Sequence, residues 1–234
     1  MPKEEQSMKR SQINQVIKDM EELAGETGFK LPPFANWTPQ EWLEKGHEYD
    51  EIRDNGLGWD ITDFGMGDFT KNGFGLFTVR NGNQKMDKYV KPYAEKLLMM
   101  YPGQKAAMHF HWSKMEDIIN RGGNDVYITV YNGDKDGKML DTDVVVNTDG
   151  KVSVVPAGTK VRLTPGESIT ITPYMYHDFE VLTEGGKVLL GEVSMCNDDQ
   201  NDNRFYQDGV GRFPAIDEDE VPYRLLCNEY PTAR

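Results

Sequence analysis

From about residue 57 onward, short apolar or alternating segments of the chain are separated by Gly, Pro, Asn and Asp. Alternation with a period of two is typical of strands that bury one face. Many such segments at close spacing predict a β-sandwich or β-barrel and not a sheet built from βαβ units. The segments expected to be strands are 58–64, 73–79, 89–101, 126–130, 144–147, 152–155, 161–163, 169–171 and 188–193.

The part of the chain before residue 57 has a different pattern. Residues 1–7 are polar, and we expect a disordered tail there. A helical period begins near Ser11, a residue type suited to an N-cap, and Thr38 starts a second helix with the spacing of a capping box. We therefore expect 8–56 to be a helical extension packed on a barrel. Residues 57–234 are expected to form that barrel, with a C-terminal surface segment.

The charge of the chain restricts its partners. The formal net charge is −13 and the sequence pI is about 4.8. An acidic surface repels the phosphates of nucleic acids and anionic lipids, so the sequence argues against both as partners. The two cysteines form no Cys-x-x-Cys pair, which argues against a disulfide scaffold or a thiolate zinc site. With no apparent signal peptide or long apolar run, we expect a cytoplasmic protein.

Three of the four histidines have a spacing that suggests a metal site. His109 and His111 lie two residues apart in an extended context, so both imidazoles can point to the same face. Glu116 follows as a hard oxygen ligand, and His177 comes after the expected strand 169–171. Imidazole with carboxylate suits Mn²⁺, Fe²⁺, Zn²⁺, Co²⁺ or Ni²⁺.

The spacing around these residues resembles a known motif. The run from Gly103 to Gly123 reads Gly-x5-His-x-His-x4-Glu-x6-Gly, which resembles the first metal motif of the cupin superfamily. In the second motif Gly166 and His177 keep their separation. Its proline is displaced to Pro173, Tyr174 replaces a glycine, and Val181 replaces an asparagine. The resemblance implies a mainly β cupin-type barrel (jelly roll) with one divalent metal ion held by His109, His111, Glu116 and His177.

Further segments resemble the D-lyxose isomerase family, and they extend from about residue 8 to 214. They are 31–35, 58–60, 76–78, 93–96, 109–123, 191–205 and 212–214. The resemblance implies a D-lyxose ketol-isomerase that interconverts D-lyxose and D-xylulose, and also D-mannose and D-fructose. Such a reaction needs a Lewis acid and a base that moves a proton between C2 and C1 through a cis-enediol. The ion expected is Mn²⁺, on which four protein ligands leave two cis positions.

Two residues are the leading candidates for the chemistry beside the metal ligands. Glu192 alternates with Leu190 and Val188 at the end of a strand, and we expect it to be the catalytic base. Lys114 lies between two ligands and could stabilise the enediolate, or be a solvated loop lysine. Glu116 could itself shuttle the proton, and the sequence does not separate it from Glu192.

The substrate contacts are predicted from charge and position. Lys96 lies in an apolar strand, where a lysine needs an anionic partner or a polar ligand. Asp199, Asp202 and Arg204 could close over the sugar, although an acidic loop is also compatible with simple solvation.

Two other functions share this residue set. One is an Fe²⁺-dependent dioxygenase on the same fold, and the other is a non-catalytic sugar-binding cupin in which the metal is structural. The lysines and acids among the expected lining favour polyol recognition over the dioxygenase. We also expect a homodimer, because the open edges of a sheet need covering.

Overall fold

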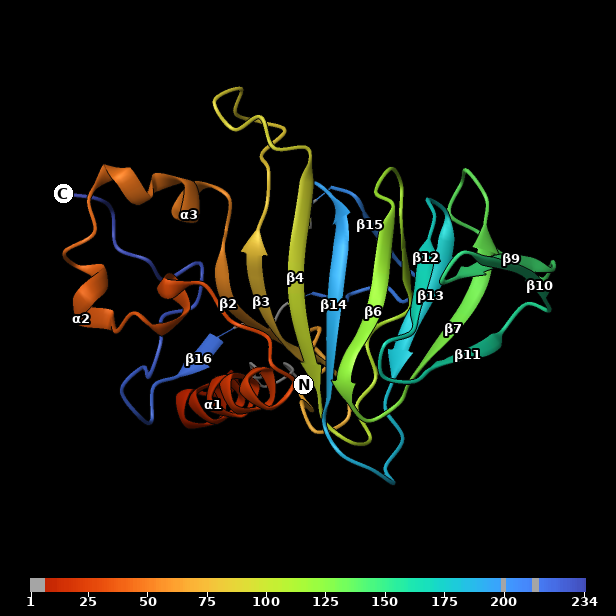
Figure 1. Cartoon of the computed structure of the whole chain (residues 1–234), viewed down its shortest axis with the longest axis horizontal. Coiled ribbons are helices and arrows are strands. Elements are labelled where there is room, and N and C mark those ends of the chain that lie inside the picture. The colour runs from red at the N-terminus through yellow and green to blue at the C-terminus, as the bar shows by residue number, and fades with distance from the viewer. Residues whose placement is uncertain (1–6, 199–200, 212–214) are drawn as a thin grey trace, which may run out of the picture.

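The computed structural model describes residues 7–198, 201–211 and 215–234. Two curled β-sheets face each other and form a mainly β, cupin-type barrel (Figure 1). The larger sheet has eight strands, in the order β10 (Lys151–Val155), β9 (Val144–Thr148), β12 (Ser168–Ile171), β6 (Glu116–Gly123), β14 (Val188–Met195), β4 (Tyr93–Met100), β3 (Phe74–Arg80) and β2 (Gly58–Thr62).

The smaller sheet has five strands in its main path, and a short strand pairs with one of them. Its order is β11 (Thr159–Leu163), β7 (Val126–Gly133), β13 (Met175–Glu180), β5 (His109–His111) and β15 (Asn203–Phe205), with β8 (Met139–Leu140) beside β7. Neighbouring strands in both sheets are antiparallel. This arrangement confirms the predicted fold class.

Apolar side chains fill the space between the two sheets. Residues such as Leu98, Ile118, Val130 and Ile171 point inward and belong to one buried cluster. As the alternation of apolar residues predicts, one face of each of these strands lies in the core. The central strand β6 was not among the predicted segments, because its inner face carries the polar residues Glu116 and Asn120 as well as Ile118.

A second apolar cluster lies on the outer face of the larger sheet. There α1 (Arg10–Glu26) buries Ile13, Ile17 and Met20 against β2, β3 and β4. The helix can approach β3 closely because Gly75 has no side chain, and a Cβ there would lie 2.8 Å from Val16. The helix begins at Arg10 and not after a Ser11 cap, since the Ser11 hydroxyl donates to Asp219 instead.

The other helical segments lie beside β2 at one side of the barrel (Figure 1). They are η1 (Pro33–Asn36), α2 (Pro39–Trp42), η2 (His47–Tyr49) and α3 (Asp50–Asp54). Thr38 caps α2 as predicted, with the Thr38 hydroxyl accepting from the Glu41 N–H and the Glu41 carboxylate accepting from the Thr38 N–H.

The first described residues pair with part of the C-terminal segment outside the barrel. Ser7, which we expected in the tail, belongs to β1 (Ser7–Lys9), and this strand pairs in parallel with β16 (Ala215–Asp217). The remainder of the expected tail, residues 1–6, lies outside the described residues. Further along the C-terminal segment, the Tyr230 ring stacks on Trp42 with centroids 3.8 Å apart. In the described ranges, no helix is both long and apolar enough to cross a membrane.

Candidate active site

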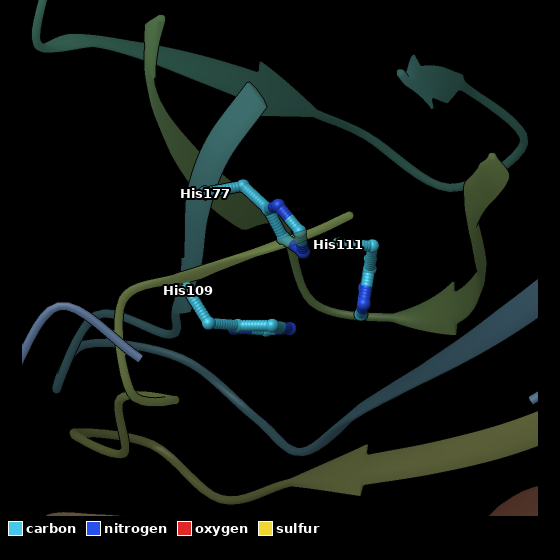
Figure 2. Close-up of side chains that lie close together, drawn as sticks. All are labelled: His109, His111 and His177. Carbon is cyan, nitrogen blue, oxygen red and sulfur yellow. The ribbon is translucent and has the colours of Figure 1, made fainter. Parts of the chain in front are cut away.

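Three histidines converge inside the barrel. His109 and His111 lie on β5, and His177 lies on the adjacent β13, directly opposite His109 in the register. The ligand atoms of the three rings lie within 4.8 Å of one another, and the rings turn toward a common point (Figure 2). His109 and His111, which are two residues apart on β5, thus point to the same side of the strand, as the sequence predicts.

Backbone carbonyls orient two of these rings. Nδ1 of His109 donates to the Ala107 carbonyl at 2.8 Å, and Nδ1 of His177 donates to the Met175 carbonyl at 2.9 Å. Each bond assigns the proton to Nδ1 and leaves the Nε2 lone pair available to a metal ion. Burial lowers the pKa of His109 well below its ordinary value and also lowers that of His111. Neutral imidazole, the form that binds metals, is therefore favoured at these positions.

Glu116 lies beside the three histidines. Its Oε1 atom lies 3.3 Å from Nε2 of His111 and 3.2 Å from Nε2 of His177. Burial alone would raise the pKa of Glu116, but the Lys114 ammonium and the neighbouring His111 hold it well below its ordinary value. The Glu116 carboxylate is therefore negatively charged, the form in which it could serve as an oxygen ligand.

These donors fit a divalent metal ion. Cis ligands at about 2.0–2.2 Å from one ion lie roughly 3 Å apart, close to the spacing of Oε1 from the two nitrogens. Among the described residues, Nε2 of His177 is buried without a hydrogen-bond partner. Buried polar atoms are normally satisfied, so an unpartnered nitrogen at this point is consistent with an ion there. The His109, His111 and His177 group could thus hold a metal.

The turn before His177 departs from the usual cupin glycine. Tyr174 has φ of +64°, a left-handed conformation that is uncommon for a residue with a side chain. Its backbone is fixed on both sides, because its N–H donates to the His111 carbonyl at 3.0 Å and its carbonyl accepts from Gly133 at 2.7 Å. The tyrosine replaces the glycine while the turn keeps its shape, and His177 still reaches the site.

His109, His111 and Glu116 line a cavity of about 510 Å³. Its lining consists of Asp60, Thr62, Phe64, Phe74, Leu76, Lys96, Leu98, His109, His111, Lys114, Glu116, Phe179, Glu192, Asn203, Phe205 and Gly211. The larger sheet supplies most of the charged groups, while four phenylalanines form apolar walls. An apolar cavity with a few convergent polar groups is typical of a site for a small molecule.

Glu192 and two lysines form an ionic cluster in this cavity. Oε1 of Glu192 lies 2.9 Å from Nζ of Lys114 and 3.3 Å from Nζ of Lys96. Lys114 also contacts Oε2 of Glu116 at 2.6 Å, which connects the cluster to the metal ligands. All four side chains are at most 7% exposed, and the opposite charges compensate one another. Glu192, Lys114 and Lys96, chosen from separate parts of the sequence, therefore lie together.

The predicted substrate contacts in the later loop are placed differently. The Asp202 carboxylate accepts from the backbone N–H groups of Ser113 and Lys114, at 2.8 and 3.0 Å, and is not part of the cavity lining. Arg204 points away from the cavity and donates to the Phe205 carbonyl. Asp199 lies outside the described residues. Substrate contact by these three residues stays a prediction.

The prediction missed several lining residues. Asn203 and Phe205 stand opposite His111 and His109 in the pairing of β15 with β5, so they share the face of the ligands. Asn203 and Phe205 flank Arg204, so on a strand they face the side opposite to Arg204. The sequence would have indicated this if 203–205 had been predicted as a strand. Asp60, on β2, lies at the far side of the cavity, and no local pattern indicates that it does.

Solved structures share this fold. The L-ribose isomerase of Acinetobacter sp. DL28 in complex with L-ribose aligns with a TM-score of 0.60 at 12% identity, covering 91% of this chain and 99% of that one. The L-ribose isomerase of Cellulomonas parahominis with L-psicose aligns with a TM-score of 0.59 at 15% identity, and covers 91% and 99%. Fold and site together define a cupin-type barrel protein with a histidine-rich site that could hold a metal.

Sequence relatives give the family. The model of the D-lyxose isomerase family matches residues 8–230. A D-lyxose/D-mannose isomerase of Serratia proteamaculans is 44% identical over 95% of this chain and 98% of its own length, and one of Escherichia coli O157:H7 has the same values. This chain belongs to the D-lyxose isomerase family, and it is a sugar isomerase.

Proposed function

We propose that this protein is a metal-dependent aldose–ketose isomerase that interconverts D-lyxose and D-xylulose, and also D-mannose and D-fructose. The substrates follow from the names of relatives that are 44% identical over nearly the full chain. The observation that supports the chemistry best is the position of Glu192. Its carboxylate lies between two lysines, in the same cavity as His109, His111 and Glu116.

His109, His111, Glu116 and His177 would hold the ion, for which we propose Mn²⁺. Three imidazoles and one carboxylate suit a borderline divalent metal ion. When bound, such an ion polarises the sugar carbonyl and the neighbouring hydroxyl and stabilises the negative charge that develops there.

The residues of the chain would move the protons. Glu192 removes the proton from C2 of the aldose and returns it to C1, through a cis-enediol, while the proton of the C2 hydroxyl is transferred to the oxygen on C1. The ammonium groups of Lys114 and Lys96 can donate to the two substrate oxygens and stabilise the enediolate. Glu116 is the alternative base. Its carboxylate lines the same cavity as Glu192, and Lys114 contacts both carboxylates.

Other residues would bind the substrate, support the turn that carries Lys114, or form the walls of the cavity. Lys96 is our proposed substrate contact on β4. Asp202 supports the turn that carries Lys114, because its carboxylate accepts from two consecutive N–H groups of that turn. The phenylalanine walls exclude water from the reacting carbons.

We also propose a homodimer. The outer face of the larger sheet is covered by α1 over β2, β3 and β4, but Val145, Val152 and Val154 at its other end are 59–65% exposed. Strand β10 forms that edge of the sheet. A second copy packed on this face would cover the exposed valines and the edge. Light scattering of the wild-type protein and of Val154→Lys tests this, with a monomeric wild type contradicting it.

The test of the proposed function is removal of the metal with a chelator, followed by readdition of Mn²⁺, with conversion of D-lyxose to D-xylulose assayed without oxygen. We expect activity to disappear and return, because the carbonyl is no longer polarised in the apo protein. Activity unaffected by complete chelation would contradict the metal role, and no conversion with any divalent ion would contradict the substrate assignment.

A further inference from the structure

A second cavity adjoins the one that holds the histidines. Its volume is about 300 Å³, and Asp60 and Leu76 line both cavities. A second link joins them, because Asn197 lines the second cavity and its Oδ1 lies 3.4 Å from Nζ of Lys114. Nothing in the proposed isomerisation of a five-carbon sugar requires this additional space.

A row of inward-facing residues crosses the larger sheet toward this second cavity. Glu192 on β14 stands opposite Lys96 on β4, and Lys96 stands opposite Thr78 on β3. Glu192 and Lys96 line the first cavity, whereas Thr78 lines the second. Since neighbouring strands are about 4.8 Å apart, Thr78 lies roughly 5 Å beyond Lys96 and 10 Å beyond Glu192.

Thr78 contributes a buried hydroxyl to the second cavity. Its side chain is 6% exposed, and its hydroxyl has no hydrogen-bond partner among the described residues. The amides around it are, by contrast, satisfied by one another. The Asn55 amide donates to the Asn81 carbonyl at 3.0 Å, and the Asn83 amide donates to Oδ1 of Asn55 at 3.1 Å. The cavity thus combines a fixed polar wall with one free hydroxyl, a combination suited to a neutral hydroxyl group of a ligand.

We propose that the second cavity is the subsite for the sixth carbon of a hexose, and that the Thr78 hydroxyl binds the terminal hydroxyl group. This inference rests on the proposed function, which places C1 and C2 beside Glu192. From there the far end of the sugar extends across Lys96 toward Asp60 and Thr78. A pentose ends at Asp60, within the first cavity, whereas a hexose is one carbon longer and passes Leu76 into the second.

The test is the isosteric variant Thr78→Val, assayed on D-mannose and on D-lyxose. We expect kcat/KM for D-mannose to fall about 3- to 10-fold, the effect of one lost neutral hydrogen bond, while the value for D-lyxose stays within about 2-fold. Thr78→Ser, which keeps the hydroxyl, should retain the wild-type ratio of the two values. Thr129→Val is the matched control, because Thr129 is another buried strand threonine and lines neither cavity.

The outcomes separate this inference from the function on which it rests. A wild-type enzyme that converts neither sugar overturns the proposed function. A wild-type enzyme that converts both, with Thr78→Val lowering both values equally or neither, overturns the subsite. If Thr78→Val does not fold, Thr78→Ala provides the second test, because it removes the same hydroxyl with a smaller side chain and should lower kcat/KM for D-mannose more than for D-lyxose. Equal loss on the two sugars in that variant contradicts the proposal.

Discussion

Two buried ionic clusters on opposite faces of the larger sheet can be compared directly. On the outer side, the Arg10 guanidinium is 1% exposed and lies 2.7 Å from Glu218, and it also pairs with Glu229. On the inner side, Lys96 and Lys114 pair with Glu192. Both clusters compensate their buried charges with opposite charges.

The difference between the two clusters is the space beside them. The Arg10 cluster joins α1 to the C-terminal segment, and each carboxylate binds the guanidinium through both oxygens. The Glu192 cluster faces a cavity of about 510 Å³ that His109, His111 and Glu116 also line. Buried charge alone therefore does not identify an active site, whereas buried charge beside a cavity does. The Arg10 cluster should contribute to stability, and the Glu192 cluster to turnover.

The largest effect should come from Glu192→Gln. Glutamine keeps the shape and accepts hydrogen bonds from the lysines, but it cannot take up the C2 proton, so we expect kcat to fall about 10²- to 10⁴-fold. Metal content should be retained, since Glu192 is not among the proposed ligands. Glu95→Gln is the control, because Glu95 pairs with Arg80 outside the cavity. Near wild-type turnover of Glu192→Gln would transfer the role of base to Glu116.

Arg10→Met tests the other side of the comparison. The change leaves Glu229 without its guanidinium partner, and we expect the free energy of unfolding to fall by about 3 kcal/mol. The kcat of the folded enzyme should not change. Arg162→Met is the matched control, since that ion pair with Asp125 is exposed and screened by water and should contribute little to stability. Equal losses of stability in the two variants would show that burial of Arg10 has no special importance.

Lys96→Met sharpens the comparison within the inner cluster. Lys114 still compensates Glu192, so the protein should fold, but one donor to the substrate oxygens is lost. We expect kcat to fall about 10-fold in steady-state assays. Lys187→Met removes a lysine that pairs with Asp19 on the outer side and serves as the control. A Lys96→Met enzyme that loses stability but keeps its kcat would make the inner cluster structural, like that of Arg10.

The smallest effect concerns another polar contact of α1. The Tyr101 hydroxyl donates to Oδ2 of Asp19 at 2.6 Å. Burial alone would raise the pKa of Asp19, but the hydrogen bonds from Tyr101 and Gln15 and the charge of Lys187 hold it below its ordinary value of 3.8. A lowered carboxyl pKa stabilises the folded state above the unfolded value, and this stability is lost as the pH falls through the folded value.

Tyr101→Phe should therefore destabilise the protein in a pH-dependent way. We expect a loss of about 1 kcal/mol near neutral pH, from the missing hydrogen bond. Denaturant unfolding at several pH values should show this difference beginning to shrink below about pH 4 and shrinking further as the pH falls through the lowered pKa of Asp19 in the folded wild type. A difference that is constant down to pH 2 would mean that Tyr101 acts through packing alone.

The sequence predicted the parts of this molecule that depend on local spacing. His109 and His111 share a face because residues two apart on a strand do so in any fold. Thr38 and Glu41 form a capping box because both partners lie within one helical turn. Glu192 points inward because it alternates with the buried residues Leu190 and Val188. The apolar alternation likewise indicated most strands, but it failed for β6, where polar site residues interrupt the pattern.

Only the tertiary structure decided which distant residues meet. Asp60, Thr78, Lys96 and Glu192 lie on neighbouring strands of one sheet because of their register, and no spacing in the sequence encodes that register directly. Arg204 and Asn203 are adjacent in sequence, yet only Asn203 lines the cavity, since consecutive strand residues face opposite sides. The chemistry of each side chain could be read from the chain alone, but its neighbours depended on how the strands pair.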